Sequence, residues 1–357
     1  MKESSKVESR GVVGLDLGDR RSQVCRLDGP SGAILEERQV ATSAPGLQQY
    51  FAALGPHRVA LETGTHSLWV GRLLRQLGHE VILANASKVR AISASLRKSD
   101  ERDARCLAQL ARVDPQLLAP VQPRDERAQQ ALSVIRAREG LVQARTKLVN
   151  QVRGTVKAFG ARLPGGSTAS FAKRANAALP SQLKSALEPL VRIIAELSQE
   201  IAAFDRDVEA WAERFVVTQR LRQIKGVGAL TALVYVLTLG DPERFARSRA
   251  VGPYVGLAPA SRSSGDTQPQ LPISKQGDRL LRRLLVQASH YVLGPFGQDS
   301  DLRRFGLRLA QRGGKNGKKR AVVAVARKLS VLLHRLWVSG ADYVPLHQAV
   351  RVERATS

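Results

Sequence analysis

The chain has 357 residues, enough for two or three domains with well-buried cores. Its 56 Lys and Arg outnumber its 31 Asp and Glu, and the net charge of +25 favours a polyanionic partner. Its two cysteines, Cys25 and Cys106, are too few and too far apart in the sequence for a disulfide framework or a zinc site.

An acidic membrane surface is the rival to nucleic acid as the polyanionic partner. However, no basic amphipathic helix with an aromatic face is evident near either end of the sequence. The first ten residues are polar and charged, and no apolar run reaches 18 residues. We therefore expect a cytoplasmic protein that has no membrane partner.

The first predicted domain, residues 1–124, alternates strand and helix patterns. Three strands precede an alternation of helices and strands, which is the order of a ribonuclease H-like α/β fold. The predicted strands are residues 12–16, 22–27, 34–42, 58–62 and 80–84, and the predicted helices are 46–54, 67–77 and 87–111, with a break near Ser99.

The second predicted domain, residues 125–215, is a helical coiled-coil region. An earlier helix repeats apolar residues every seven positions, and a later one repeats them at alternating steps of three and four. The breaker-rich segment 163–180 between them is predicted to be a loop. The two helices form a hairpin or a dimerising coiled coil, or they pack on their own domain. The later repeat consists of Leu187, Leu190, Ile194, Leu197, Ile201, Phe204, Val208, Trp211 and Phe215.

The third predicted domain, residues 216–345, is mainly helical, and residues 346–357 form a tail. Its entry, residues 224–228, resembles a helix-hairpin-helix turn before an apolar helix at 229–239. Backbone N–H groups of such a turn can hold a DNA phosphate, so Lys225, Gly226 and Gly228 are candidate contacts, although turns of this form are common. Further helices are predicted at residues 275–293 and 319–338.

Asp16 ends the first predicted strand, and its sequence surroundings allow three interpretations. It caps the turn that follows, or it belongs to a phosphate turn of an actin-like ATPase, or it is a metal ligand of a nuclease type. The ATPase fold also needs a second Asp-x-Gly loop and a late Gly-Gly adenosine loop. Neither is convincing here, because Gly313-Gly314 lies in a basic polar stretch.

Three further acids favour the metal-ligand interpretation of Asp16. Glu62 ends a second buried strand, and Asp100 and Asp103 project from one face of a helix. Converging carboxylates repel one another unless cations neutralise them. Hard oxygen ligands select Mg²⁺ or Mn²⁺, and two such ions can clamp the oxygens of a phosphoryl transfer.

These residues, together with later motifs, resemble the insertion-sequence transposases of the IS110 type, a family that also includes pilin-gene inverting recombinases. Its DEDD tetrad corresponds to Asp16, Glu62, Asp100 and Asp103. Segment 221–228 resembles the entry to the family's second domain, with Lys225 where proline is usual. Its C-terminal signature is resembled by residues 255–259, 263–265, 273–278 and 280–283.

The resemblance implies a RuvC-like domain and a transposase domain with a nucleophilic serine. That role falls on Ser264, with Ser263 as its immediate neighbour and rival. A serine hydroxyl needs a base or a metal to activate it, and its attack on a DNA phosphate gives a covalent phosphoserine link. Developing charge on the phosphate could be neutralised by Lys275, Arg279, Arg282 and Arg283.

The resemblance also implies a bridge RNA that pairs with donor and target DNA, so that base pairing reads the sequence. Between Leu271 and Arg335 the chain has 15 Lys and Arg against three Asp. The loop at 311–320 suits phosphates, although it could be a plain solvated basic loop. Its candidate contacts are Arg312, Lys315, Lys318, Lys319 and Arg320.

The preferred interpretation is a nucleoid-associated bacterial transposase that exchanges strands of double-stranded DNA, guided by RNA and assembled as a dimer or tetramer. One alternative is a metal-dependent junction endonuclease of the RuvC type, in which water makes the attack. The other is a nucleic-acid-binding protein without catalysis.

Overall fold

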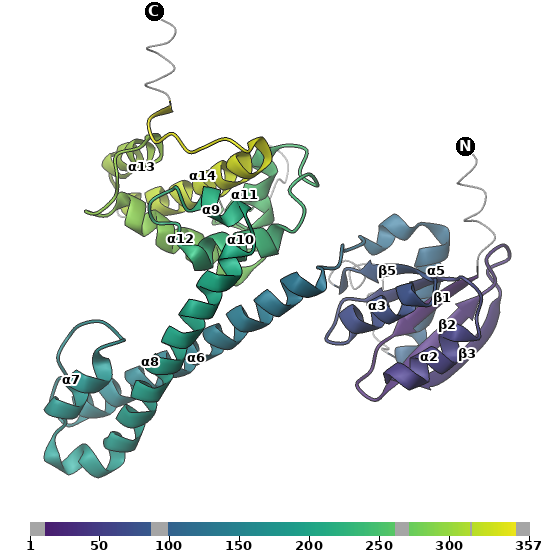
Figure 1. The fold of residues 1–357 in the computed structure, drawn as a ribbon, viewed down its shortest axis with the longest axis horizontal. Helices are drawn as coiled ribbons and strands as arrows, with labels where there is room; N and C mark the ends of the chain where they lie inside the picture. Colours follow the sequence, from purple (N-terminus) through teal and green to yellow (C-terminus); the bar gives the residue numbers. More distant parts are fainter. Residues whose placement is uncertain (1–10, 87–98, 261–270, 315, 348–357) are drawn as a thin grey trace, which may run out of the picture. The chain divides into compact units, whose positions relative to one another are not determined.

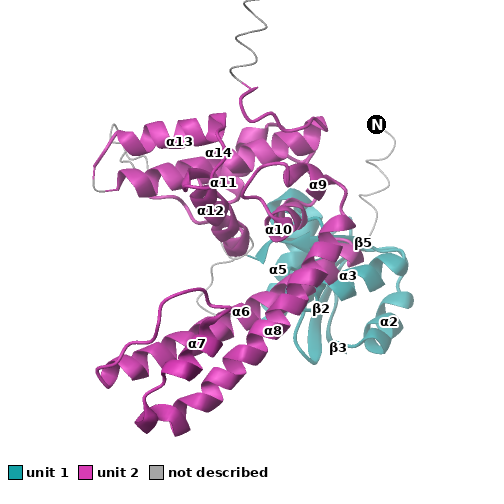
Figure 2. Ribbon diagram, turned by 60° about the vertical axis from the view of Figure 1, so that its left-hand side comes forward, with its two compact units in different colours: residues 1–123 teal, residues 124–357 magenta. Residues whose placement is uncertain are grey.

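The computed structural model describes residues 11–86, 99–260, 271–314 and 316–347. The chain forms two compact units, residues 1–123 (unit 1) and residues 124–357 (unit 2), which Figure 2 colours separately. None of the described helices combines the length and apolar character that a bilayer span demands.

Unit 1 is built on a five-stranded sheet with the strand order β3-β2-β1-β4-β5 (Figure 1). The first three strands pair antiparallel, and β4 and β5 continue the sheet parallel to β1. The predicted mixed α/β architecture is confirmed, and each strand lies within one residue of its predicted bounds. The strands are β1 (Val12–Asp16), β2 (Arg21–Leu27), β3 (Ile34–Ala41), β4 (Arg58–Glu62) and β5 (Glu80–Ala84); the helices are α2 (Ala44–Ala52), α3 (Ser67–Gln76) and α5 (Asp100–Val113).

The sheet of unit 1 is covered on both faces because its central strands are apolar at consecutive positions. Val13 and Leu15 point to one face, where they pack in a cluster with Phe51 of α2 and residues of α3. Val12, which points to the opposite face, packs in a cluster with Leu107 of α5. Helix α5 therefore covers this second face of the sheet, together with Leu118 of the short 3₁₀ helix Pro115–Leu118.

Unit 2 is mainly helical in its described residues, as predicted for the remainder of the chain. Two long helices, α6 and α8, pack together with the short α7, and the helices from α9 onward form a bundle in which α10 is central. The helices are α6 (Glu126–Ala158), α7 (Phe171–Ala178), α8 (Lys184–Glu213), α9 (Val217–Leu221), α10 (Ala229–Leu239), α11 (Val251–Tyr254), α12 (Arg279–Leu293), α13 (Asp301–Gln311) and α14 (Gly317–Ser339), with short 3₁₀ helices at Ser181–Leu183 and Ser248–Ala250.

Helices α6 and α8 pack side by side within the one chain (Figure 1). The apolar repeat of α8 supplies the contact: Leu187, Ile194, Ile201 and Val208, each seven residues apart, are all buried. The last residue of the predicted repeat, Phe215, lies beyond the end of α8. An apolar seam of this kind joins two helices through interlocking side chains.

The prediction that residues 163–180 form only a loop was wrong, because this segment contains α7. Its Gly and Pro residues lie outside the eight helical residues. Phe171, Ala172 and Ala175 give α7 a short apolar stripe that is buried against α6 and α8. Tertiary burial thus stabilises a helix that its own sequence supports only weakly.

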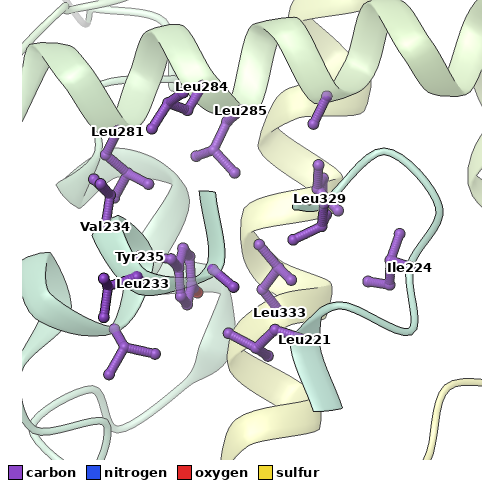
Figure 3. Packing of buried hydrophobic residues seen from close by; sticks show 14 of the residues in the cluster. Leu221, Ile224, Leu233, Val234, Tyr235, Leu281, Leu284, Leu285, Leu329 and Leu333 are labelled. Atoms are coloured by element: carbon purple, nitrogen blue, oxygen red, sulfur yellow. The ribbon is translucent and has the colours of Figure 1, made fainter. Parts of the chain in front are cut away.

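Helix α10 is the centre of the C-terminal bundle, since all but one of its eleven residues are buried. Figure 3 shows Leu233, Val234 and Tyr235 among leucines of α12 and α14. The Tyr235 hydroxyl donates a hydrogen bond of 2.6 Å to the Ser330 carbonyl oxygen of α14. A helix that is apolar on all sides needs such complete enclosure.

Candidate functional site

Asp16 and Glu62 lie at the same edge of the unit 1 sheet. Each is the last residue of its strand, and β1 and β4 are parallel neighbours in which Leu15 pairs with Leu61. One step further along this register, Asp16 comes beside Glu62. Both side chains are half-buried. The sheet therefore places two of the four predicted ligands next to each other.

Gly14 brings α5 into direct contact with β1. A Cβ atom at this position would overlap the Ala104 carbonyl oxygen and would lie 2.6 Å from the Ala108 nitrogen. Only glycine permits the helix backbone to approach the strand so closely. Gly14 lies two residues before Asp16, and Ala104 lies one residue after Asp103. The contact between these backbones therefore brings the two acids toward the same region.

The direction of α5 is set by contacts at both of its ends. Near its end, the Ala111 carbonyl accepts a hydrogen bond of 3.3 Å from Arg58, the first residue of β4. Near its start, Arg105 forms a two-bonded salt bridge with Glu37 of β3, at 2.9 and 2.8 Å. Because α5 runs opposite to β4, its first turn faces the edge where β4 ends.

Asp100 and Asp103 occupy that first turn of α5. The turn begins at Ser99, whose hydroxyl accepts a hydrogen bond of 3.3 Å from the Arg102 N–H. Asp103 is half-buried, whereas Asp100 is exposed. Acids at a helix N-terminus also interact favourably with the helix dipole, so the position alone is compatible with a purely structural role.

The thiol of Cys106 lies close to charges from two elements. Its pKa is raised above the ordinary value, first by burial and then by the negative charges of Asp103 and Glu62. Asp103 comes from α5 and Glu62 from β4, so both carboxylates act on one group. This shared neighbour shows that α5 and β4 bring their acids to the same part of unit 1.

Two polar residues beside this edge were not foreseen from the sequence. His66 follows β4, and its Nε2 lies 3.5 Å from Asp19 in the turn after β1. The indole N–H of Trp69 donates a hydrogen bond of 3.0 Å to His66 Nδ1. Nδ1 is therefore the acceptor, and the ring proton lies on Nε2, toward Asp19. The only sequence signal was a histidine four residues after Glu62.

The acids at this edge have the chemistry of a magnesium or manganese site, since all four offer carboxylate oxygens. Their elements converge through the β1–β4 pairing and through the α5 contact at Gly14. Across the described ranges of the chain, however, no three His, Cys, Asp or Glu side chains are grouped closely enough to hold one ion.

Ser264, the predicted nucleophile, and its neighbour Ser263 lie outside the described residues. The segments on either side of them are described, and they are joined. Pro259 and Ile273 form an antiparallel bridge, and the Ala260 N–H donates a hydrogen bond of 2.9 Å to the Pro272 carbonyl. The two halves of the predicted C-terminal signature therefore come together at the ends of the segment that carries Ser264.

Two glycines permit this junction. A Cβ atom on Gly256 would overlap the Gln276 carbonyl oxygen, and one on Gly277 would overlap the Tyr254 carbonyl oxygen. Both glycines also have positive φ angles, of 72° and 78°. A larger residue at either position would force the two backbone segments apart.

The turn at residues 224–228 has one buried side and one side that is exposed to solvent. Ile224 and Val227 are buried, while Lys225 and Gly228 are exposed. Gly226, with a φ of 100°, packs against Tyr291 of α12. Gly228 caps α10 without a side-chain hydrogen bond. The exposed N-cap residue Gly228 therefore leaves the backbone N–H groups at the start of α10 as candidate contacts for an anion.

The basic residues predicted around α12 differ in their surroundings. Lys275 and Arg279 are exposed. Arg282 donates hydrogen bonds to the carbonyl oxygens of Val255 and Gln276, at 3.1 and 2.8 Å. These bonds help to hold the junction beside the Ser264 segment.

Arg283 forms a two-bonded salt bridge with Glu139 of α6, at 2.7 and 2.5 Å. Its hydrogen bond is the largest cause that lowers the pKa of Glu139. In the described structure, Arg283 joins the long helix α6 to the C-terminal bundle.

The remaining predicted contacts lie from the end of α13 into the first turn of α14. Lys315 lies outside the described residues. The other four are all exposed: Arg312, Lys318, Lys319 and Arg320. Lys319 and Arg320 also line a large cavity beside α14.

Two family models match the sequence. A model of DEDD transposases of the IS110 type, described as "Transposase", matches residues 13–160. A second model, described as "Transposase IS116/IS110/IS902 family", matches residues 218–300. The first range contains the four acids of unit 1, and the second contains Ser264 and the turn at 224–228.

Several curated proteins are similar along most of their length. A "Probable family 20 transposase" of Pseudomonas aeruginosa is 30% identical over 341 residues, which cover 93% of this chain and 98% of the relative. A "Transposase for insertion sequence element IS1328" of Yersinia enterocolitica is 32% identical over 79% of this chain and 84% of its own length. A "Transposase for insertion sequence element IS1111A" of Coxiella burnetii is 27% identical over 93% and 91%.

Proposed function

Because the chain belongs to the IS116/IS110/IS902 family of transposases, which are DNA-recombining enzymes, we propose that it exchanges DNA strands through a serine-linked intermediate with Ser264 as the nucleophile. One observation carries this proposal. The described segments on both sides of Ser264 pack together through Gly256 and Gly277, so residues 260 and 271, which flank the Ser264 segment, are held close together.

The proposed step is a phosphoryl transfer. The Ser264 hydroxyl oxygen bonds to a DNA phosphorus and one bridging P–O bond of the backbone breaks. The serine proton passes to a base and from it to the departing oxygen, which leaves as a hydroxyl. Attack by the freed hydroxyl of another strand reverses the step and releases the serine. The exposed cations Lys275 and Arg279 both follow the Ser264 segment in the sequence. They would stabilise the negative charge that develops on the phosphate.

Unit 1 supplies the metal-binding acids of the proposed mechanism. Its strand order and the α5 crossing support a ribonuclease H-like, RuvC-like domain. Asp16, Glu62, Asp100 and Asp103 would hold Mg²⁺ or Mn²⁺, which would polarise phosphate oxygens when bound. The carboxylates would position the ion through their charge, which a protonated or amide side chain lacks.

The proposed partners are double-stranded DNA, a structured guide RNA and further copies of the chain. The excess of positive charge in unit 2 supports a nucleic-acid partner, since lysine and arginine contacts to phosphates dominate such binding. The half-buried residues of the α8 repeat, such as Leu197 and Phe204, support an oligomer, because they offer apolar area beyond the α6 contact. Sequencing the RNA that co-purifies with the protein tests the guide RNA, and its absence from active protein would refute it.

A covalent adduct tests the nucleophile. The wild type and a Ser264→Ala variant are incubated with labelled element-end DNA and Mg²⁺, and SDS-resistant protein–DNA adducts are resolved by electrophoresis. The wild type and a matched Ser263→Ala variant should form the adduct, and Ser264→Ala should form none while it still binds the DNA. An adduct in Ser264→Ala would assign the nucleophile elsewhere.

The same assay separates the proposal from its strongest rival. An endonuclease that uses water would cleave the DNA in a Mg²⁺-dependent way and leave no adduct in any variant. The carboxylate edge of unit 1 favours this rival, since such acids alone suffice for metal-dependent hydrolysis. If the Ser264→Ala variant cleaves DNA at the wild-type rate, the reaction is hydrolysis by water and not strand exchange through Ser264.

A further inference from the structure

A cavity of about 960 Å³ lies along one face of α14. Its walls come from α13, from the 3₁₀ helix at Ser248–Ala250 and from the two described segments around Pro259 and Ile273. We call it the α14 groove. Six cations line it: Arg249, Lys319, Arg320, Arg327, Lys328 and Arg335.

The sequence of α14 explains this composition. One side of the helix is buried in the core of the bundle, and the groove side follows steps of three and four residues. Arg320, Arg327 and Arg335 are exposed along this side, and the half-buried Ala324 and Val331 lie between them. The helix thus presents a row of guanidinium groups above an apolar strip.

The charges of the α14 groove are of one sign. Within the described part of the chain, no Asp or Glu lines it, whereas Asp301 and Asp342 line a neighbouring cavity together with Lys328 and Arg335. Six like charges around one cavity repel one another, and an anionic ligand would relieve that repulsion. Gly252 leaves room for one of them, because an added Cβ would lie only 3.1 Å from the Arg327 side chain.

The floor of the groove is apolar rather than charged. Leu257 is buried there, and Ile273 and Val323 are half-buried. Phe305 adds an aromatic ring, and the ammonium of Lys328 lies 4.0 Å from its centroid. A duplex backbone would use the cations but not this floor, since its bases are stacked on one another. An unpaired nucleotide has both a phosphate for the rim and a base for the floor.

We propose that the α14 groove binds an unpaired stretch of DNA strand, with its phosphates on the arginine row and a base on the apolar floor. This inference rests on the proposed function, because strand cleavage frees an unpaired end. The groove is also in the appropriate place, since Pro259 and Ile273 line it and the segment of Ser264 connects these two residues.

Fluorescence anisotropy with the full-length protein tests the groove. The probes are a labelled single-stranded DNA, the same strand in a duplex, and an abasic version with the same phosphates. Arg327→Gln/Arg335→Gln should weaken single-strand binding about tenfold and should reduce its salt slope by about 1.4, the loss of two phosphate contacts. Duplex binding should change by less than about twofold.

A matched control removes the same two charges elsewhere. Arg192→Gln/Arg206→Gln changes two exposed arginines of α8, outside the groove, and should leave single-strand affinity within about twofold of wild type. Circular dichroism verifies folding, and Val331→Glu, which places a carboxylate on the floor, provides a second variant that should also weaken single-strand binding.

Three results would overturn the inference: equal losses of single-strand and duplex binding in the groove variant, equal affinity of the wild type for the abasic strand, or tighter binding of the same sequence as RNA. Failure of the proposed function would look different. The groove would then still select single-stranded DNA, while the adduct assay would show no link to Ser264.

Discussion

The two units of this protein differ in how they acquire a surface for phosphate chemistry. Unit 1 contains 17 of the chain's 56 basic residues and 13 of its 31 acids, so unit 2 contains the other 39 bases and 18 acids. Unit 1 is thus close to balanced, and its distinctive feature is a set of acids at one sheet edge. Unit 2 has most of the excess positive charge and distributes it over helix faces.

The difference shows that the acids depend on backbone geometry and the cations on side-chain exposure. In unit 1, the glycine contact between β1 and α5 determines where Asp103 lies. In unit 2, one side of α14 is buried in the core of the bundle, and the arginines lie on the opposite, exposed side. Substitutions that alter either the backbone geometry of unit 1 or the side-chain contacts of unit 2 test this contrast.

The largest expected effect comes from removing one carboxylate of unit 1. Glu62→Gln should lower strand cleavage about 100-fold to 1000-fold, because an amide does not neutralise or orient a divalent cation as a carboxylate does. DNA binding, measured by anisotropy, should remain, since unit 2 has most of the positive charge. Glu80→Gln, at the opposite end of the parallel strands, is the control and should cleave normally. Equal cleavage activity of both variants would mean that Glu62 at this sheet edge takes no part in the reaction.

The next largest effect tests the backbone contact in unit 1. Gly14→Ala should destabilise the unit by about 2–3 kcal/mol, because the added Cβ overlaps the Ala104 carbonyl oxygen. Gly55→Ala is the control, since nothing lies within 4 Å of its added Cβ, and it should change stability by less than about 0.5 kcal/mol. Urea unfolding measures both.

Labelling of Cys25 makes this prediction specific to unit 1. The thiol is fully buried in the cluster with Ala104 and Ala108, and burial raises its pKa to about 11. It should therefore react slowly in the wild type and faster in Gly14→Ala, in a Cys106→Ser background. Unchanged labelling in Gly14→Ala would mean that α5 does not depend on this contact.

A smaller effect is expected in the core of unit 2. Tyr235→Phe should cost about 1 kcal/mol, because it leaves the buried Ser330 carbonyl without the 2.6 Å hydrogen bond from the tyrosine hydroxyl. Tyr254→Phe is the control, since its hydroxyl lies 3.4 Å from the Thr238 carbonyl at a half-buried position. If both variants unfold at the same urea concentration, the bond does not hold α10 to α14.

The smallest effect concerns the salt bridge between α6 and α12. Arg283→Gln should cost about 0.5–1 kcal/mol at neutral pH, since Arg283 is partly exposed and solvent weakens the pair. Arg304→Gln should leave the unfolding midpoint unchanged, because its partner Asp299 is exposed whereas Glu139 is largely buried.

The pH dependence of this difference has a defined sign. Arg283 lowers the pKa of Glu139 below its ordinary 4.5, so the folded state binds that proton less readily than the unfolded state. The stabilisation is then complete above pH 4.5 and is lost as the pH falls through the lowered value. Urea midpoints of the wild type and Arg283→Gln should therefore converge in acid, and a constant gap would contradict this linkage.

The sequence predicted the strands of unit 1 well because strands that are buried on both faces of a sheet have consecutive apolar residues. It predicted α10 for the same reason, since an apolar run of eleven residues is bounded by Gly228 and Gly240. Helix α13 was not predicted, because it buries only Leu302 and Gly306 and has little apolar pattern. Short helices with few buried residues give weak local signals.

The candidate sites were predictable only in part. The acids of unit 1 were identified as candidates from strand ends and from the resemblance, but His66 and Asp19 were missed because two separate loops bring them together. Lys319 and Arg320 were named from a basic run. Arg249 and Arg335 were not, since they are 86 residues apart and share the groove only through the packing of α14.

The sequence by itself determined the strands of unit 1 and the apolar helix α10, and it placed Asp16 and Glu62 at strand ends. Those properties depend on residues that are near one another along the chain. The tertiary structure decided the direction of α5, the junction at Gly256 and Gly277, and the α14 groove. Each of these depends on backbone segments that approach closely from distant positions, and such approaches are set by packing rather than by local pattern.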